Sequence, residues 1–281
     1  MNDILRAEEQ YQQVHRYSEV HRTLYQEPVV VAVILLTNDD GIQAPGLKVM
    51  RGHLEELGSV MVVAPEDEMS GVSHSVTLEK PISVRWIDKN SAAVGGTPTD
   101  CVLLAVHKLM KKRPDIVVSG INLGPNLGND VTYSGTVAAA LEAAIHGIKA
   151  VAISVASRKD PDFEPAARFG KKLVQHLAAL EVPSGTFLNV NVPNTPNGEI
   201  RGVRITRLGR RTYRDDVIKL DDPEGEECYK IGGEPICEME EGTDVEAIES
   251  AFISVTPISL DLTDHTFLRE LKELGEKISD F

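Results

Sequence analysis

Short apolar runs alternate with amphipathic segments over the first two thirds of the chain. The runs are rich in Val, Ile, Leu and Ala, as is typical of strands that are buried on both faces. They occupy residues 29–37, 60–63, 116–118, 150–155 and 187–192. Apolar positions at helical spacing fill the intervals, in segments 45–57, 97–113, 137–146 and 166–180. This alternation predicts an α/β fold with a doubly wound, mostly parallel sheet.

Residues at the segment ends agree with this pattern. Leu47 and Met50 belong to the apolar stripe of the first helical segment, and Pro45 stands where a first helical turn tolerates proline. Gly58 follows the segment as a natural C-terminal cap. A further apolar run at 82–87 reads as an edge or hairpin strand.

The pattern changes near residue 194. Turn residues crowd the segment 194–198. Short β segments then follow at 202–206, 227–231, 234–239 and 251–256, before an amphipathic helix from about Asp264. Gly232 and Gly233, between two of these segments, predict a hairpin turn. We therefore expect a core at 29–193 and a smaller, β-rich part at 194–281 that completes the fold or mediates oligomerisation.

Residues 1–28 form a separate polar extension. Tyr11, Val14 and Tyr17 recur there at roughly helical spacing. This spacing predicts a short amphipathic helix that docks on the body or on a partner chain. A frayed terminus is the alternative and explains the polar sequence equally well. The extension is assigned no chemistry.

The overall charge narrows the range of partners. The 281 residues carry a net charge of −14, which disfavours binding to long nucleic acids or to anionic membranes. An anionic substrate would need a locally positive site, made by a metal or a helix N-terminus. No run is long enough to span a membrane and the N-terminus lacks an apolar signal region, so a cytoplasmic location is expected.

Several familiar sites are missing from the sequence. It contains no G-x-G-x-x-G, no G-x-x-x-x-G-K-[ST], no H-E-x-x-H and no G-x-S-x-G. Its three cysteines, Cys101, Cys228 and Cys237, have no metal-binding spacing. Cys228 and Cys237 could pair across a hairpin, although a reducing cytoplasm favours two thiols.

Polar residues instead follow the ends of the predicted strands. Asp39 and Asp40 follow the first strand, Ser70 and Asn122 lie in loops after later strands, and residues 134–136 begin a helix. In a parallel sheet these strand ends gather on one edge. The oxygen-only set suits an octahedral cation such as Mg²⁺ or Mn²⁺, and the helix start suits an anion.

Each of these residues also has an ordinary structural explanation. Asp40 and Gly41 could form a solvated Asp-Gly turn. Ser70 could brace its loop, Asn122 could cap a turn, and Ser134 could be a plain helix N-cap. Their joint placement on one sheet edge favours a functional site, because independent loops need not all carry oxygen ligands there.

Ordered sequence blocks resemble the SurE (survival protein E) family. The first block is Ile-Leu-Leu-Thr-Asn-Asp-Asp-Gly-Ile at 34–42. Later blocks follow in the family's order at 63–65 with 70–71, 96–101, 114–122 and 133–136. The resemblance covers about residues 34–265. It implies a Rossmann-like core and a smaller C-terminal part used in homodimers or homotetramers.

The resemblance also implies a metal-dependent phosphatase of nucleoside 5′- and 3′-monophosphates, sometimes also of short polyphosphate. It implies one divalent ion per subunit, Mg²⁺ or Mn²⁺, with ligands that fall on Asp39, Asp40, Ser70 and Asn122. The two aspartates are then the catalytic residues. The family's Ser-Gly-Thr block, expected to bind substrate, falls on Ser134, Gly135 and Thr136.

Some interpretations remain open. A non-catalytic nucleotide-binding or scaffold protein could use the same pocket, although binding alone would not need four metal ligands. His74 is a candidate acid for the leaving group, with a solvated loop histidine as the ordinary alternative. Six arginines within 201–214 read as a solvated β-hairpin or as contacts to substrate or a neighbouring subunit.

Overall fold

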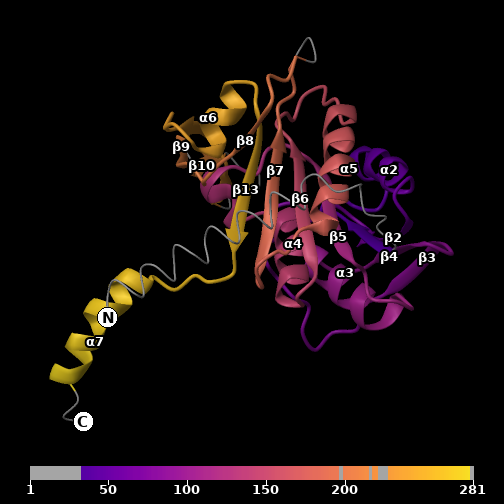
Figure 1. Cartoon of the computed structure of the whole chain (residues 1–281), viewed down its shortest axis with the longest axis horizontal. Helices are drawn as coiled ribbons and strands as arrows, with labels where there is room; N and C mark the ends of the chain where they lie inside the picture. The colour runs from indigo at the N-terminus through magenta and orange to yellow at the C-terminus, as the bar shows by residue number, and fades with distance from the viewer. Residues whose placement is uncertain (1–32, 196–198, 215–216, 221–226, 279–281) are drawn as a thin grey trace.

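The structure is a computed structural model and describes residues 33–195, 199–214, 217–220 and 227–278. The helix predicted within residues 1–28 lies outside these residues. One nine-stranded sheet organises the molecule, in the order β3-β4-β2-β1-β5-β6-β7-β13-β8 (Figure 1). Its strands are β1 Val33–Thr37, β2 Ser59–Pro65, β3 Val84–Asp88, β4 Ser91–Val94, β5 Ile116–Leu123, β6 Lys149–Val155, β7 Thr186–Val192, β8 Val203–Ile205 and β13 Ile253–Ser259.

The sheet is doubly wound and mostly parallel, as predicted. From β1 the chain moves outward through β2 to β4, and β5 then pairs with the opposite side of β1. Antiparallel pairing occurs only where β3 meets β4 and β13 meets β7 within this sheet. The order of the strands therefore reverses between β1 and β5, and such a switch point is where α/β sheets bind ligands.

Helices cover both faces of the sheet (Figure 1). Ile34 and Leu36 of β1 face the helices α2 (Pro45–Leu54) and α5 (Glu164–Ala179). Leu35 faces the helices α3 (Pro98–Leu104) and α4 (Gly135–Ile145). Consecutive strand residues point to opposite faces, so a continuous apolar run is what this two-sided burial requires.

Two strands differ from the prediction. Strand β5 extends to Leu123, so Asn122 lies at the end of a strand and not in the predicted loop. The pairing of β5 with β6 shifts its register between Gly120 and Asn122. The glycine- and asparagine-rich sequence of this irregular strand end resembles a loop. Strand β4 was missed because its sequence, Ser-Ala-Ala-Val, has little apolar bulk.

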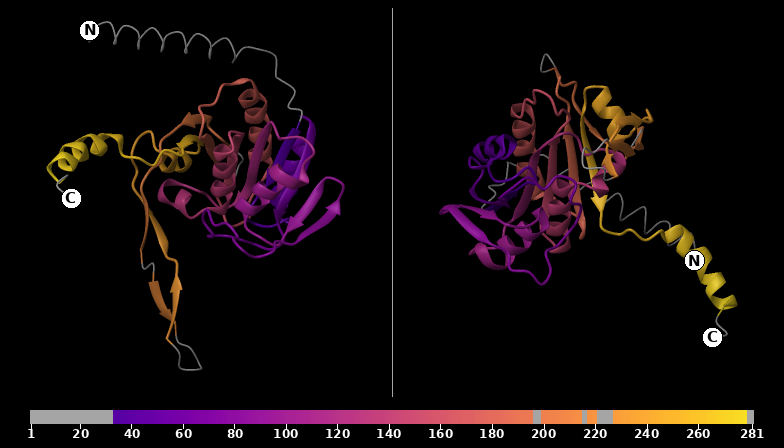
Figure 2. Two further views of the ribbon diagram at one scale, coloured as in Figure 1. Left: turned by 90° about the horizontal axis from the view of Figure 1, so that it is seen from below. Right: turned by 180° about the vertical axis from the view of Figure 1, so that it is seen from behind.

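The hairpin predicted at Gly232 and Gly233 is wrong. Strand β11 (Cys228–Ile231) pairs with β10 (Val217–Leu220), whereas β12 (Glu234–Cys237) pairs with β9 (Arg211–Arg214). The two glycines therefore lie between two consecutive strand pairs of one ribbon, which projects from the body (Figure 2).

The C-terminal segment returns to the main sheet before it leaves the body. Helix α6 (Asp244–Glu249), which the sequence did not predict, precedes β13, and β13 joins β7 on the central sheet. Helix α7 (His265–Lys277) then stands apart from the body (Figures 1 and 2). Its start agrees with the prediction, because the Asp264 side chain caps it. No helix in the described ranges has both the length and the apolar character needed to cross a bilayer.

Candidate active site

The carboxyl ends of the central strands surround a cavity of about 390 Å³. Asp39 from the end of β1, Ser70 from the loop after β2, Asn122 from β5 and Ser134 from the start of α4 all line it. Sequence positions almost one hundred residues apart are thus brought to one place by the parallel sheet. Asp40, Gly135 and Thr136 are not among the residues that line the cavity.

Asp39 is held from several sides. The residue is 3% exposed, and its carboxylate accepts a hydrogen bond on Oδ1 from the Thr136 hydroxyl. Its backbone oxygen accepts a 2.7 Å bond from Met69 N, which fixes the loop that carries Ser70. Gly135 leaves room for this carboxylate, because an added Cβ would lie 2.9 Å from Asp39 Cβ.

Burial works against the negative charge of both aspartates. Loss of water raises the pKa of Asp39 to about 6, despite the hydrogen bond from Thr136. Burial also raises the pKa of Asp40, despite the 3.0 Å bond that its Oδ2 accepts from Leu123 N. No described basic side chain forms an ion pair with either carboxylate. Two desolvated adjacent acids without a counterion fit a bound cation.

The other expected ligands offer oxygen atoms to such a cation. Asn122 donates its amide Nδ2 to Gly124 O at 2.8 Å, which leaves its side-chain oxygen for a metal. Ser70 donates its hydroxyl to Glu68 Oε1 at 2.9 Å and keeps its lone pairs. The described residues contain no group of three His, Cys, Asp or Glu side chains suited to a metal. A cation here would therefore need the hydroxyl and amide oxygens as well as the carboxylates, and a hard divalent ion accepts that mixture.

The Ser-Gly-Thr block divides into two roles. Ser134 is the N-cap of α4, as its ordinary explanation held, because its Oγ accepts from Val137 N at 3.1 Å. It also lines the cavity. Gly135 and Thr136 are buried against Asp39 instead. The N-terminal end of an eleven-residue helix thus reaches the cavity beside the two acids, where its partial positive charge favours an anion.

A buried amide network positions the loop that follows β5. Asn126 N donates to Asn191 Oδ1 at 2.8 Å, and Asn126 Nδ2 donates to Ser154 Oγ at 2.8 Å. The backbone oxygen of Asn126 accepts bonds of 2.9 Å from both Asn189 and Asn191. The strands β6 and β7 therefore fix the cavity wall that the Asn122 loop forms.

Several cavity residues were not among the predicted site residues, among them Asp130, Arg158 and Tyr213. Asp130 accepts hydrogen bonds from Arg211 and, at 2.8 Å, from the Tyr213 hydroxyl. Burial and the bond to Asp130 raise the pKa of Tyr213 to about 12. Arg211 belongs to the arginine-rich stretch and does not line the cavity itself, but it binds Asp130, which does. Arg158 follows β6 on the same sheet edge, a position that the strand-end argument could have included.

His74 lies outside the cavity lining and contacts a different group. Its Nε2 lies 2.8 Å from Glu142 Oε2, and His146 lies 3.0 Å from the other oxygen of the same carboxylate. The contact ties the Ser70 loop to the body of α4. The structure therefore gives His74 a bracing contact and does not bring it to the two aspartates.

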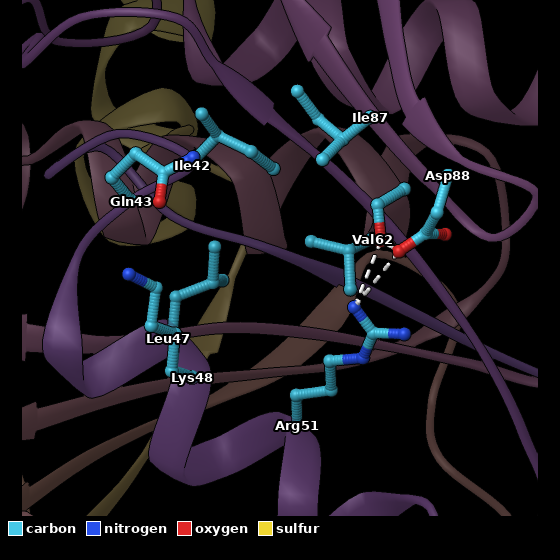
Figure 3. Close-up of a pocket in the computed structure, with 9 residues that line it drawn as sticks. Ile42, Gln43, Leu47, Lys48, Arg51, Val62, Ile87 and Asp88 are labelled. Atoms are coloured by element: carbon cyan, nitrogen blue, oxygen red, sulfur yellow. Dashed lines mark hydrogen bonds and ion pairs between the residues drawn. The ribbon is translucent and has the colours of Figure 1, made fainter.

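A second pocket, of about 120 Å³, lies beside α2 (Figure 3). Its arginine, Arg51, bonds to Ser91 at 2.9 Å and pairs with Asp88 at 3.6 Å. Glu55 also binds this guanidinium. Arg51, Asp88 and Ser91 satisfy one another in this pocket, so it is a weaker candidate for chemistry.

Comparison with known proteins gives concordant matches. The family described as "Survival protein SurE" matches residues 34–215. The 5′-nucleotidase SurE of Pelobacter propionicus is 47% identical over 238 residues, which cover 84% of this chain and 96% of that protein. The 5′-nucleotidase SurE of Geobacter sulfurreducens is 48% identical over 241 residues, covering 85% and 92%. The crystal structure of the SurE protein from Aquifex aeolicus superposes with a TM-score of 0.76 at 43% identity and covers 86% of this chain and 99% of that one.

Proposed function

This chain belongs to the SurE family and is a 5′-nucleotidase, and we propose that it hydrolyses nucleoside monophosphates with a divalent cation held by Asp39, Asp40, Ser70 and Asn122. One observation carries the proposal. Buried Asp39 lines the same cavity as Ser134, the N-cap of α4, and neither Asp39 nor the adjacent, half-buried Asp40 forms an ion pair with a described basic side chain. The unpaired carboxylates call for a cation and the helix N-terminus for an anion, and a metal-assisted phosphatase needs both.

The residues of the chain prepare the site for in-line attack on phosphorus. When bound, Mg²⁺ or Mn²⁺ supplies a Lewis acid for the phosphoryl oxygens and acidifies the attacking water. Thr136 fixes the orientation of Asp39, and Leu123 N fixes that of Asp40. One of these two carboxylates orients the water. The water oxygen forms the new bond to phosphorus, the ester oxygen leaves with a proton, and nucleoside and phosphate result.

The start of α4 stabilises the charge that grows on the phosphoryl group. The Ser134 hydroxyl lines the cavity at the N-terminal end of this helix, where a preorganised donor and the partial positive charge of the helix lower the barrier. All these groups act on the phosphoryl end of the substrate. We therefore extend the proposed substrates to 3′-monophosphates and short polyphosphate, which present the same terminal group.

The proposed partner, besides the nucleotide, is a second copy of this chain. Helix α7 and its C-cap residue Ile278 carry exposed apolar side chains: Phe267, Leu268, Leu271, Leu274 and Ile278. A helix with such a face, standing apart from its own body (Figure 2), is suited to packing on a neighbouring subunit in a homodimer or homotetramer. Light scattering on the intact chain, beside a Leu271→Glu variant, tests this.

We also propose a cytoplasmic location, where a nucleotide pool supplies the substrate and a thiol such as buried Cys101 stays reduced. The net charge of −14 supports small nucleotides over long nucleic acids as ligands. We propose no membrane partner for this chain.

Phosphate release from a panel of 5′- and 3′-monophosphates, with Mg²⁺ or Mn²⁺ and then with EDTA, tests the reaction. We expect metal-dependent release that falls by about 10²-fold or more in Asp39→Asn and in Asp40→Asn. Asp67→Asn is the matched control, because it removes one charge from an exposed position of the Ser70 loop. Unchanged turnover in both active-site variants would overturn the proposed site. Folded protein that binds nucleotides without releasing phosphate would instead favour the non-catalytic alternative.

A further inference from the structure

We propose that Arg158 binds the phosphoryl group of the substrate, an assignment that rests on the function proposed for the cavity. Arg158 lies three residues beyond the end of β6, on the same sheet edge as Asp39 and Asn122. Three charged residues line the cavity in the described part of the chain: Asp39, Asp130 and Arg158. Arg158 is the basic one among them.

The two acids of the cavity do not neutralise this arginine. Asp130 is already occupied by Arg211 and by the Tyr213 hydroxyl. Asp39 is bound by Thr136 and is one of the proposed metal ligands. Within the described residues no carboxylate lies within ion-pair distance of Arg158. Its charge is therefore available for a ligand.

Arg51 provides the contrast within the same protein. It also lines a pocket, but its guanidinium already binds Asp88 and Ser91 (Figure 3) and, in addition, Glu55. An arginine with three partners stabilises the local structure. An arginine at a cavity without an acidic partner is suited to an anionic ligand.

The backbone of β5 and its loop places the Arg158 side chain. A Cβ on Gly124 would lie 3.0 Å from Arg158 Nε and 3.4 Å from Cζ. The guanidinium thus lies against Gly124, two residues after Asn122, and a side chain at position 124 would displace it. Arg158 also lines the same cavity as Asp39 and Asn122. Its charge therefore lies at the edge that carries the proposed metal ligands.

A guanidinium in this place supplies what a phosphate requires. It stays protonated at any physiological pH and presents paired N–H donors that match two phosphate oxygens. In a chain with a net charge of −14, it adds a local positive charge to that of the cation and the α4 N-terminus. Its removal should weaken binding of phosphate much more than binding of an uncharged nucleoside.

The test measures binding and turnover separately. Calorimetry with Mg²⁺ present gives the affinities for inorganic phosphate and for adenosine, and steady-state kinetics give KM and kcat for AMP. In Arg158→Gln we expect the phosphate affinity to fall by about 10-fold or more, as for the loss of a charged hydrogen bond. Adenosine binding should change less than twofold. The phosphate affinity of Arg158→Lys should lie between those of the wild type and Arg158→Gln. Free guanidinium should restore turnover to Arg158→Ala.

Lys159→Gln is the matched control. It removes the same charge from the adjacent residue, whose side chain does not line the cavity, and should leave all these quantities unchanged. Equal phosphate affinity in Arg158→Gln and the wild type would overturn the proposal. An equal loss of phosphate and adenosine binding would also overturn it, because that pattern indicates a purely structural role. A wild type that releases no phosphate from nucleotides would overturn the proposed reaction. If Arg158→Gln still lost phosphate binding and Lys159→Gln did not, the Arg158 assignment would stand.

Discussion

The Thr136 hydroxyl donates a hydrogen bond to Oδ1 of Asp39 and thereby joins the start of α4 to the end of β1. Both side chains are buried. Thr136, in the first turn of the helix proposed to bind the anion, thus also fixes a residue proposed to bind the cation. Its hydroxyl group therefore joins the proposed substrate site to the proposed metal site.

Thr136→Val keeps the shape of the side chain and removes its donor. The buried Asp39 carboxylate then loses a hydrogen bond, which should cost about 1–3 kcal/mol of stability. A less well oriented carboxylate should also raise the Mn²⁺ concentration needed for half-maximal activity. Urea unfolding and a Mn²⁺ titration of AMP hydrolysis measure the two effects. Thr136→Ser should have the stability and the Mn²⁺ dependence of the wild type. A Thr136→Val variant with normal Mn²⁺ dependence would contradict the proposed role of this hydroxyl group in metal binding.

Gly135→Ala should damage the protein because α4 lies directly against Asp39. The added methyl group would lie 2.9 Å from Asp39 Cβ and 3.2 Å from Pro98 Cγ, so the helix start must shift. We expect a loss of roughly 1–3 kcal/mol together with reduced turnover. Thermal unfolding and kcat for AMP measure the change.

Gly52→Ala is the matched control for this substitution. Gly52 lies within α2, and a Cβ there meets nothing within 4 Å. Replacing a helical glycine by alanine should stabilise the protein by about 0.5–1 kcal/mol with unchanged activity. If Gly135→Ala and Gly52→Ala had the same effects on stability and turnover, close contact between α4 and Asp39 would not be the cause of the losses in Gly135→Ala.

Metal binding should stabilise the wild type through its native site. A ligand that binds only the folded state at a concentration 100 times its Kd adds about 2.7 kcal/mol to the free energy of unfolding. Mn²⁺ should therefore raise the Tm of the wild type, and EDTA should reverse the rise. In Asp39→Asn the rise should be largely absent. A Tm that responds to Mn²⁺ equally in both proteins would place the cation elsewhere.

The Glu142 carboxylate should make stability depend on pH. It is buried between His74 and His146. Burial opposes its charge, but the hydrogen bonds and charges of the two histidines lower its pKa below the ordinary value of 4.5. A carboxyl whose pKa is lower in the folded state stabilises the protein above the unfolded value, and this stabilisation is lost as the pH falls through the folded value.

Glu142→Gln removes the titrating group and keeps the shape of the side chain. The wild type should be more stable than this variant at pH 7, and the difference should shrink once the pH falls below about 4.5. Urea midpoints of both proteins at pH 7 and pH 4 measure it. A difference that is constant across this range would show that the charge of Glu142 contributes nothing.

Local sequence patterns were sufficient for most of the core. Ile34, Leu35 and Leu36 form an uninterrupted apolar run because helices cover both faces of β1. Ser134 and Asp264 were identifiable as helix starts because an N-cap acts within three residues of its own position. Such signals need no knowledge of distant residues. The same reasoning placed Asp39, Ser70, Asn122 and Ser134 on one sheet edge, and the structure confirms that they share a cavity.

Pairings between distant segments could not be obtained in this way. Gly232 and Gly233 have the composition of a hairpin turn, yet β11 pairs with β10 and β12 with β9, because the strands extend a ribbon whose partners lie earlier in the chain. Strand β4 is identified by its pairing with β2 in the structure, because its small side chains give little periodic signal in the sequence.

The sequence by itself determined the alternation of strands and helices, the sheet edge that carries the chemistry and the residues suited to a cation. Only the tertiary structure decided that Thr136 binds Asp39 and that Asp130 is occupied by Arg211 and Tyr213. It also decided that Arg158 stands at the cavity with no carboxylate of the described residues within ion-pair distance. The physical reason is one of range. Burial periodicity and helix capping act over a few residues, whereas the occupancy of a charged group depends on whichever distant segments the fold brings beside it.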